Sequence, residues 1–240
     1  MKVDILGVKI DDYTMDEAVK KVSQYINSDK KYKIYTPNPE FVIAANEDEE
    51  FKDVLNKGDL VIPDGIGIVM ASKIMKKSIK ERVAGYDLLQ KVFNEIKDTD
   101  KTVYLFGAAK GVAANAASKM QQLHKGLNII GYHDGYFDED EEKLIMETIN
   151  SLKPDLLLVG LGAPKQEKWI NENINNLNVK VAIGVGGSFD GMAGNVKRAP
   201  MIYQKLGLEW FYRLIKQPTR IKRMIKLPMF LIKVIVHRKK

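Results

Sequence analysis

Hydrophobic residues along the chain follow two alternating patterns. Short, continuous apolar runs are typical of buried strands, and they predict strands over residues 32–35, 59–62, 103–106, 127–130, 156–159 and 179–185. Between these runs, apolar residues recur every three or four positions, which predicts helices over residues 14–27, 51–58, 87–97, 112–123, 141–152 and 165–174. Buried strands that alternate with helices predict a parallel sheet covered on both faces, a Rossmann-like α/β fold.

The alternation stops near residue 200 and divides the chain. We predict an α/β core over residues 1–200 and a helical C-terminal appendage over residues 201–240. Helical spacing in the appendage covers two segments, and two prolines are expected to break the path: residues 203–216 and 219–226, with breaks at Pro218 and Pro228.

The composition limits the available chemistry. Of the 240 residues, 45% are hydrophobic and 29% charged, which excludes the disordered and low-complexity classes. The absence of cysteine excludes disulfides, thiolate nucleophiles and cysteine-bound zinc. The three histidines, His124, His133 and His237, lack the i, i+4 spacing of a helical metal pair. Catalysis would therefore depend on carboxylates, hydroxyls, amides, arginines or backbone dipoles.

Positive charge is concentrated at the C-terminus. The formal net charge is +7, but residues 205–240 hold eleven Lys and Arg against one acid, Glu209, so the other 204 residues carry a net charge of −3. A basic segment on a mildly acidic core indicates a polyanionic partner, either nucleic acid or an anionic membrane surface.

The chain offers no segment expected to span a membrane. Its most apolar stretch, residues 227–236, is interrupted by Lys233, whereas spanning takes ~20 apolar residues. Such a segment fits a helix lying in the membrane interface. Asp4 interrupts the N-terminal region where a signal peptide needs an apolar run, so a cytoplasmic location is expected.

Polar residues follow the predicted strands, and ligands of parallel α/β sheets bind beyond the carboxyl ends of strands. Thr36 and Asn38 follow the first strand, and Asp64 follows the second at the position of a general base. Structural alternatives stay open: Asn38 can cap a helix that starts at Pro39, and Asp64-Gly65 can form a turn.

Three glycine-rich loops also follow strands, and Gly107, Gly184, Gly186 and Gly187 are the candidate binding positions among them. None of the loops completes the G-x-G-x-x-G dinucleotide fingerprint, which argues against NAD but not against phosphate binding by backbone N–H groups. A packing role for these glycines is equally open.

Several charged residues lie near predicted helix starts. Arg82 could meet a phosphate, and Asp87 is a candidate helix cap. Lys165 opposes the helix dipole, which suggests a bound anion. Asp138-Glu-Asp140 matches the D-x-D pattern of metal-dependent sugar transferases, but acids at a helix start are better explained by the dipole.

These loops together resemble the WecG/TagA/CpsF glycosyltransferase family, and most closely its TagA type, over nearly the whole chain. The motifs that carry the resemblance occur in this order: Thr36-Pro-Asn-Pro-Glu40, Asp64-Gly-x-Gly67, Arg82-x-x-Gly-x-Asp87, Leu105-Phe-Gly-Ala108, Val159-Gly-Leu-Gly-x-Pro-Lys-Gln-Glu167, Gly184-Val-Gly-Gly187, Arg198-Ala-Pro200 and Gly207-Leu-Glu-Trp210.

The resemblance implies an inverting, metal-independent transferase that needs no cofactor. It would move N-acetylmannosamine from UDP to the 4-hydroxyl of N-acetylglucosamine on undecaprenyl diphosphate, forming a β-1,4 linkage in wall teichoic acid linkage-unit synthesis. Asp64 would be the general base, and Thr36, Asn38 and Gln166 would orient the sugar or acceptor hydroxyl. The substrate-binding residues of the core would be Arg82, Gly107, Lys165, Gly184, Gly186, Gly187 and Asp190.

The basic appendage gains a role from the same resemblance. Arg213, Arg220 and Arg223 would bind the acceptor diphosphate, and residues 229–232 would enter the interface of an anionic membrane. The enzyme would then be peripheral on the inner face of the cell membrane. An ordinary solvated helix is the structural alternative.

Other functions stay open. The resemblance also allows UDP-glucose or the uronic acid form of UDP-N-acetylmannosamine as the donor. From other classes, a nicotinamide-binding oxidoreductase fits the strand–helix alternation and a nucleic-acid-binding protein fits the basic segment. The glycine loops and the lack of a recognition module disfavour these two, so no nucleic-acid partner is expected. A homo-oligomer is compatible with the sequence.

Overall fold

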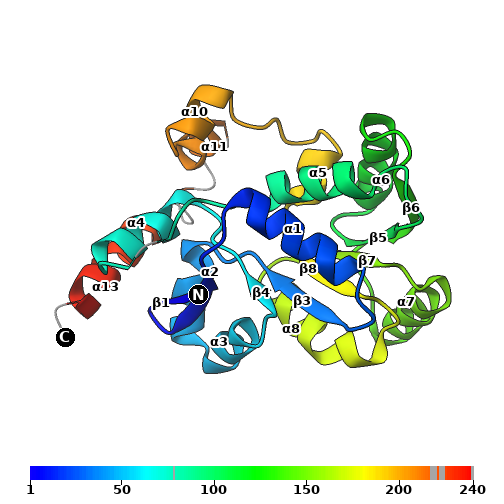
Figure 1. Ribbon diagram of the computed structural model, residues 1–240, viewed down its shortest axis with the longest axis horizontal. Helices are drawn as coiled ribbons and strands as arrows, with labels where there is room; N and C mark the ends of the chain where they lie inside the picture. Colours follow the sequence, from blue (N-terminus) through cyan, green and yellow to red (C-terminus); the bar gives the residue numbers. More distant parts are fainter. Residues whose placement is uncertain (78, 217–220, 222–224, 239–240) are drawn as a thin grey trace.

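The central element is a six-stranded parallel sheet. The computed structural model describes residues 1–77, 79–216, 221 and 225–238. The strand order is β4–β3–β8–β7–β5–β6 (Figure 1). The strands are β3 (Tyr32–Tyr35), β4 (Leu60–Val61), β5 (Thr102–Gly107), β6 (Asn128–His133), β7 (Leu156–Gly160) and β8 (Val181–Gly184). The predicted parallel α/β fold is confirmed.

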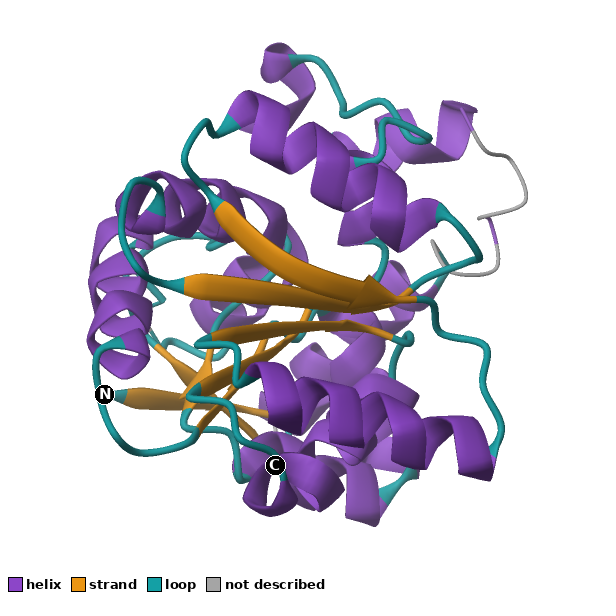
Figure 2. Ribbon diagram, turned by 90° about the vertical axis from the view of Figure 1, so that its right-hand side faces the viewer, coloured by secondary structure: helices purple, strands orange, loops and turns teal. Residues whose placement is uncertain are grey.

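Helices cover both faces of this sheet (Figures 1 and 2). One core contains the buried faces of α1 (Met15–Ile26), α5 (Gly85–Ile96), α6 (Val112–Leu123) and α9 (Ser188–Met192). The opposite core contains those of α2 (Pro39–Glu47), α3 (Glu49–Asn56), α4 (Ile66–Ile74), α7 (Glu139–Leu152) and α8 (Lys165–Asn173, continued by a 3₁₀ turn over Ile174–Asn176). Successive strand residues alternate between the two cores, as with Ile34 and Tyr35 in β3.

Most predicted bounds hold within a few residues, and the exceptions have physical causes. The capping box of α1 between Thr14 and Glu17 is confirmed. The helix predicted from Asp87 begins at Gly85, so Asp87 lies in its first turn and does not cap it. Strand β6 extends to His133, beyond its predicted end, because an edge strand is half-exposed and its polar residues hide the apolar run.

The N-terminus forms a hairpin that the strand predictions above do not include. Strands β1 (Lys2–Ile5) and β2 (Val8–Asp11) pair antiparallel across Leu6 and Gly7. Both turn residues have positive φ, 53° and 86°, as a two-residue hairpin requires. The alternation of apolar and polar residues through both strands was the available signal.

The appendage contains α10 (Met201–Lys205), α11 (Glu209–Lys216) and α13 (Lys226–Arg238). The single helix predicted over 203–216 is wrong, because the chain breaks at Gly207, whose φ is +69°. The predicted break at Pro228 is also wrong. Pro228 lies in the first turn of α13, where its missing N–H costs no helical hydrogen bond. The predicted break at Pro218 and most of the segment 219–226 lie outside the described residues.

Helix α13 packs against α2 and α4, whereas α10 and α11 are set apart from the sheet (Figure 1). Phe230 and Val234 of α13 are fully buried. The sequence predicted that Phe230 would enter a membrane interface, and this is wrong. Its side chain instead completes the hydrophobic core beside α2 and α4. The neighbouring face remains exposed and apolar, through Met229, Ile232, Ile235 and Val236. Within the described residues, no helix is long and apolar enough to cross a membrane.

Candidate active site

The carboxyl ends of β4, β3 and β8 meet at one edge of the sheet, where three predicted site residues come together. Thr36 directly follows β3, Asp64 lies three residues after β4, and Gly184 ends β8. All three line one small cavity of about 20 Å³. Its full lining is Thr36, Asp64, Gly85, Leu89, Ile183, Gly184, Val185 and Ser188.

Thr36 is nearly buried between two backbone segments. Its hydroxyl lies 3.5 Å from the carbonyl oxygen of Gly184. On its other side is Gly85, where a Cβ would lie 3.4 Å from both the methyl and hydroxyl groups of Thr36. The start of α5 is thus within van der Waals contact of the threonine.

Asp64 is held by a sharp change of chain direction. Its backbone N–H donates to the carbonyl oxygen of Pro37, 3.0 Å away, which joins the loops after β3 and β4. Gly65 follows with a φ of +92°, and α4 begins at the next residue. The half-buried carboxylate therefore sits on a backbone that both neighbouring loops fix.

Asn38 caps α2, which confirms the structural interpretation of this residue. Its side-chain oxygen accepts hydrogen bonds from the N–H groups of Glu40 at 2.8 Å and Phe41 at 3.3 Å. Pro39 occupies the first helical position. A contact between Asn38 and a sugar hydroxyl stays a prediction.

Gln166 is buried, with 1% of its surface exposed, beneath the loops after β7 and β8. Its side-chain oxygen accepts hydrogen bonds from the N–H groups of Gly162 at 3.2 Å and Gly186 at 3.0 Å. Its amide nitrogen donates to Glu167 Oε1 at 2.6 Å. In this structure Gln166 binds protein loops, and its proposed contact with a sugar or acceptor hydroxyl is untested.

Glu167 is the most unusual carboxyl group in this region, although no role was predicted from the sequence for this last residue of its motif. The residue is fully buried, and burial raises the pKa of its carboxyl to about 7, although the hydrogen bond from Gln166 lowers it. Its second oxygen, Oε2, has no hydrogen-bond partner among the residues that the structure describes.

The glycines of the predicted binding loops serve different purposes. A Cβ on Gly107 would lie 2.5 Å from the backbone of Gly160, so this glycine is needed for close approach of two strand ends. Gly186 and Gly187 would meet nothing within 4 Å, which leaves open space beside their backbone. Asp190, in α9, accepts a hydrogen bond from the Asn195 side chain at 3.3 Å.

Arg82 connects the core to the appendage. Its guanidinium lies 3.4 Å from the carboxylate of Glu209 in α11, and both side chains are largely buried. A separate ion pair within the core joins Arg198 to Asp87 of α5 through two hydrogen bonds, with the guanidinium over the ring of Tyr86. These pairings join distant parts of the chain, which sequence spacing does not show.

The remaining predicted residues lie outside this cluster of contacts. Lys165 extends over the ring of Phe137, with 4.4 Å from Nζ to the ring centre. Arg213 lies in α11, and its side chain is not described. Arg220 and Arg223 lie outside the described residues.

The Asp138-Glu-Asp140 sequence forms the start of α7. Asp138 caps this helix in a capping box with Glu141, and Asp140 pairs with Lys143 at 2.8 Å. Throughout the described ranges, no group of three or more His, Asp or Glu side chains could hold a metal ion.

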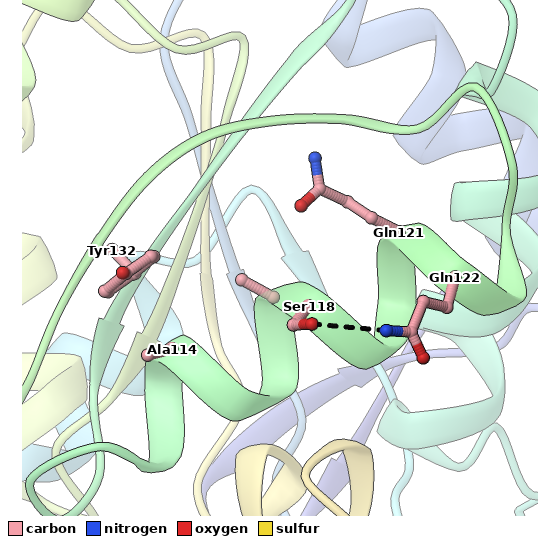
Figure 3. A pocket seen from close by; sticks show the side chains of 6 residues that line it. Ala114, Ser118, Gln121, Gln122 and Tyr132 are labelled. Carbon is pink, nitrogen blue, oxygen red and sulfur yellow. Dashed lines mark hydrogen bonds between the residues drawn. The ribbon is translucent and has the colours of Figure 1, made fainter.

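A second, more open hollow of about 410 Å³ lies along α6 and the edge strand β6. Figure 3 shows Ser118 hydrogen-bonded to Gln122, with Tyr132 standing opposite α6. Its lining residues are Ala114, Ala117, Ser118, Gln121, Gln122 and Tyr132, which include no carboxylate, lysine or arginine. The predicted site residues Thr36, Asp64 and Gly184 line the smaller cavity instead.

A parallel α/β sheet that gathers a carboxylate, a hydroxyl and open glycine loops at its carboxyl edge belongs to the class of proteins that bind ligands across that edge. The family model described as "Glycosyl transferase WecG/TagA/CpsF family" matches residues 3–240, so the chain belongs to this family. The protein is a glycosyltransferase, as the resemblance implied.

Relatives with known names match most of the chain. Three proteins from different organisms share the name N-acetylglucosaminyldiphosphoundecaprenol N-acetyl-beta-D-mannosaminyltransferase. The protein of Bacillus subtilis is 40% identical over 206 residues, covering 86% of this chain and 80% of the relative. That of Bacillus spizizenii is 38% identical over 213 residues, covering 89% and 82%. That of Staphylococcus aureus is 35% identical over 235 residues, covering 97% and 92%.

Proposed function

We propose that this protein transfers N-acetylmannosamine from UDP-N-acetylmannosamine to the 4-hydroxyl of N-acetylglucosamine on undecaprenyl diphosphate, as in teichoic acid linkage-unit synthesis. The names of the three relatives describe this sugar and this lipid-linked acceptor. The similarity extends over at least four fifths of each relative, so it includes both the core and part of the appendage.

Asp64 acts as the general base in this proposal. The observation that carries the role is the shared cavity of Asp64, Thr36 and Gly184 at the carboxyl edge of the sheet. The carboxylate accepts the proton of the acceptor hydroxyl while that oxygen bonds to the anomeric carbon and UDP leaves from the opposite side. Displacement from the opposite side inverts the anomeric configuration.

The leaving UDP gains negative charge, and the protein stabilises it without a metal ion in this proposal. The enclosed cavity is large enough only for about one water molecule, so the sugar nucleotide lies along its rim. Open space beside Gly186 and Gly187 lets a diphosphate approach their backbone. Arg82 supplies a cation near the same edge, and its pairing with Glu209 links this charge to α11.

The acceptor lipid places the enzyme at a membrane surface. The exposed apolar face of α13 contacts the interface, and the lysines and arginines of residues 205–240 attract anionic headgroups. The enzyme is then peripheral on the cytoplasmic leaflet. Three arginines of the appendage, Arg213, Arg220 and Arg223, bind the acceptor diphosphate in this proposal.

A donor comparison tests the proposal. The purified protein is incubated with a short-chain N-acetylglucosaminyl diphospholipid and one of three donors: UDP-N-acetylmannosamine, its uronic acid form or UDP-glucose. We expect a lipid product heavier by one N-acetylhexosamine, formed fastest with UDP-N-acetylmannosamine. A faster reaction with either other donor would replace the proposed sugar while leaving the family assignment intact.

A further inference from the structure

Glu167 is buried directly beneath the loops that end β7 and β8, and the reaction described above gives it no role. A buried carboxyl group with one unpartnered oxygen is costly, because charge is poorly solvated inside a protein. The neighbouring Tyr35 hydroxyl donates to the backbone oxygen of Glu167, at 3.3 Å, and leaves the carboxyl unsatisfied. The local packing therefore does not explain why an acid stands here.

The hydrogen bonds of Gln166 suggest the reason. We use "Gln166 bridge" for the two hydrogen bonds in which the N–H groups of Gly162 and Gly186 donate to Gln166 Oε1. The bridge forms only when the amide oxygen faces the loops and the amide nitrogen faces away. A free glutamine side chain can rotate its amide by half a turn, which would point N–H groups at N–H groups.

Glu167 fixes this orientation. Its Oε1 accepts from Gln166 Nε2 at 2.6 Å. An ionised carboxylate can only accept hydrogen bonds, so it selects the amide nitrogen of Gln166 and excludes the amide oxygen. The correct face of the amide is thereby turned toward Gly162 and Gly186.

Gly184 makes room for this arrangement. A Cβ at Gly184 would lie 2.8 Å from Glu167 Oε1 and 2.9 Å from Gln166 Nε2. The hydrogen bond between the two side chains therefore lies directly against the backbone at the end of β8, whose carbonyl oxygen faces the Thr36 hydroxyl.

We propose that Glu167 is a positioning residue of the transferase: it orients the Gln166 amide, and through the Gln166 bridge it holds the loops after β7 and β8 in the spacing that binds the donor diphosphate. The effect on donor binding rests on the proposed function. The effect on the two glycine N–H groups does not.

Two variants separate hydrogen bonding from filling of space. Glu167→Gln retains an oxygen that can accept from Gln166 but adds an amide nitrogen that can donate, whereas Glu167→Leu fills a similar volume without any acceptor. Ile170→Ala is a matched control, because Ile170 is fully buried in the same helix and belongs to the apolar core. It weakens α8 without altering the bridge.

Hydrogen exchange of the Gly162 and Gly186 amides, followed by NMR on the full chain, measures the bridge directly. UDP affinity and the separate KM and kcat values for the donor measure its consequence. We expect Glu167→Leu to lose protection at both amides and to raise the UDP Kd and donor KM by about tenfold, the effect of one lost hydrogen bond. Glu167→Gln should recover part of both quantities, because its amide oxygen can still accept from Gln166, and Ile170→Ala should lower the melting temperature without raising the donor KM.

Three results would overturn the proposal. Unchanged protection of the two amides in Glu167→Leu would show that Glu167 does not control the bridge. Equal losses in Glu167→Gln and Glu167→Leu would show that an acceptor oxygen at residue 167 does not help to orient Gln166. Lost protection with unchanged UDP affinity would separate the bridge from donor binding. Failure of the proposed donor with the wild-type protein would leave the exchange result valid, so the two failures are distinguishable.

Discussion

At the scale of single residues, the site combines one half-exposed acid with one buried acid. Asp64 lies on a loop at the carboxyl edge of the sheet and lines the small cavity there. Glu167 lies beneath the same edge and contacts only protein groups. The different surroundings of the two carboxyl groups suit the different tasks proposed for them, proton transfer for Asp64 and orientation of Gln166 for Glu167.

The buried acid makes stability depend on pH. Burial raises the pKa of Glu167 from its ordinary value of 4.5 to about 7. Well below pH 4.5 the carboxyl group is neutral in both the folded and the unfolded chain, so its ionisation does not affect the free energy of unfolding. As pH rises toward 7 the unfolded chain ionises first, so stability is lost, by about 3 kcal/mol once both states are ionised.

We therefore expect Glu167→Gln to raise the melting temperature above pH 7 and to lose this advantage as the pH falls toward 4.5. Thermal unfolding of both proteins across this range checks the expectation. A difference in melting temperature that stays constant with pH would contradict the raised pKa.

How far sequence reasoning reaches is also clear at this scale. Thr36, Asp64 and Gly184 could be predicted to converge because they follow parallel strands, whose carboxyl ends share one edge. The hydrogen bond between the Gln166 and Glu167 side chains could not be predicted, because adjacent residues on a helix do not normally face each other. The two side chains meet here because a neighbouring residue leaves room for them. That neighbour is Gly184, which reaches the pair only through the order of the strands in the sheet.

At the scale of elements, the glycines of the Asp64-Gly-x-Gly67 motif serve packing as well as the site. A Cβ on Gly67 would lie 2.5 Å from the ring of Pro39 in α2 and 2.6 Å from the side chain of Leu227 in α13. Helix α4, which follows the proposed base, thus packs closely against α2 on one side and α13 of the appendage on the other. A motif that sequence reasoning assigned to chemistry also fixes where the appendage docks.

Helix α13 has two faces with different tasks, which single substitutions can separate. Phe230 is fully buried, whereas Ile232 is 60% exposed on the same helix. We expect Phe230→Ala to destabilise the protein by about 3–5 kcal/mol, through lost burial and the cavity that remains. Ile232→Ala should change stability little. Chemical denaturation measures both, and equal losses would show that Ile232 is also part of the core.

Removing the whole appendage is a less informative experiment. Truncation after Ile202 is expected to reduce activity because it removes the proposed acceptor-binding arginines. It also removes Phe230 and Val234 from the core and exposes the faces of α2 and α4 that α13 covers. Lost activity in such a truncation would therefore have two causes, and point substitutions keep them apart.

At the scale of the whole molecule, the exposed apolar face of α13 and the basic C-terminus act together in the proposed membrane contact. We expect the protein to sediment with anionic vesicles and to be released by salt, because each Lys or Arg near the surface contributes about 1 kcal/mol. Ile232→Asp should weaken this binding. Leu144→Asp is the control, since Leu144 is 62% exposed on α7, a helix with no proposed membrane contact.

Equal vesicle binding by wild type and Ile232→Asp would mean that α13 does not enter the interface. Equal binding to neutral and anionic vesicles would remove the electrostatic part of the proposal.

The strands and helices were more predictable from the sequence than the helix breaks and the contacts between distant residues. Apolar runs identified every strand of the parallel sheet, most fully for the central strands β7 and β8, which are buried on both faces, and least fully for the half-exposed edge strand β6. The break at Gly207 and the continuation of helix α13 through Pro228 depend on single backbone positions, which helical spacing does not reveal. Likewise, the ion pair between Arg82 and Glu209 joins residues 127 positions apart, and only the fold brings them together.

The most direct test of the account is UDP release from UDP-N-acetylmannosamine in the presence of the lipid acceptor and EDTA, for wild type and Asp64→Asn. The substitution keeps the shape of the side chain and removes its ability to accept a proton. We expect wild-type turnover to survive EDTA and the variant to lose about 10²–10⁴-fold in kcat, the contribution of a general base. Full turnover by Asp64→Asn would contradict the central claim that Asp64 is the base, and loss of wild-type turnover in EDTA would contradict metal-free catalysis.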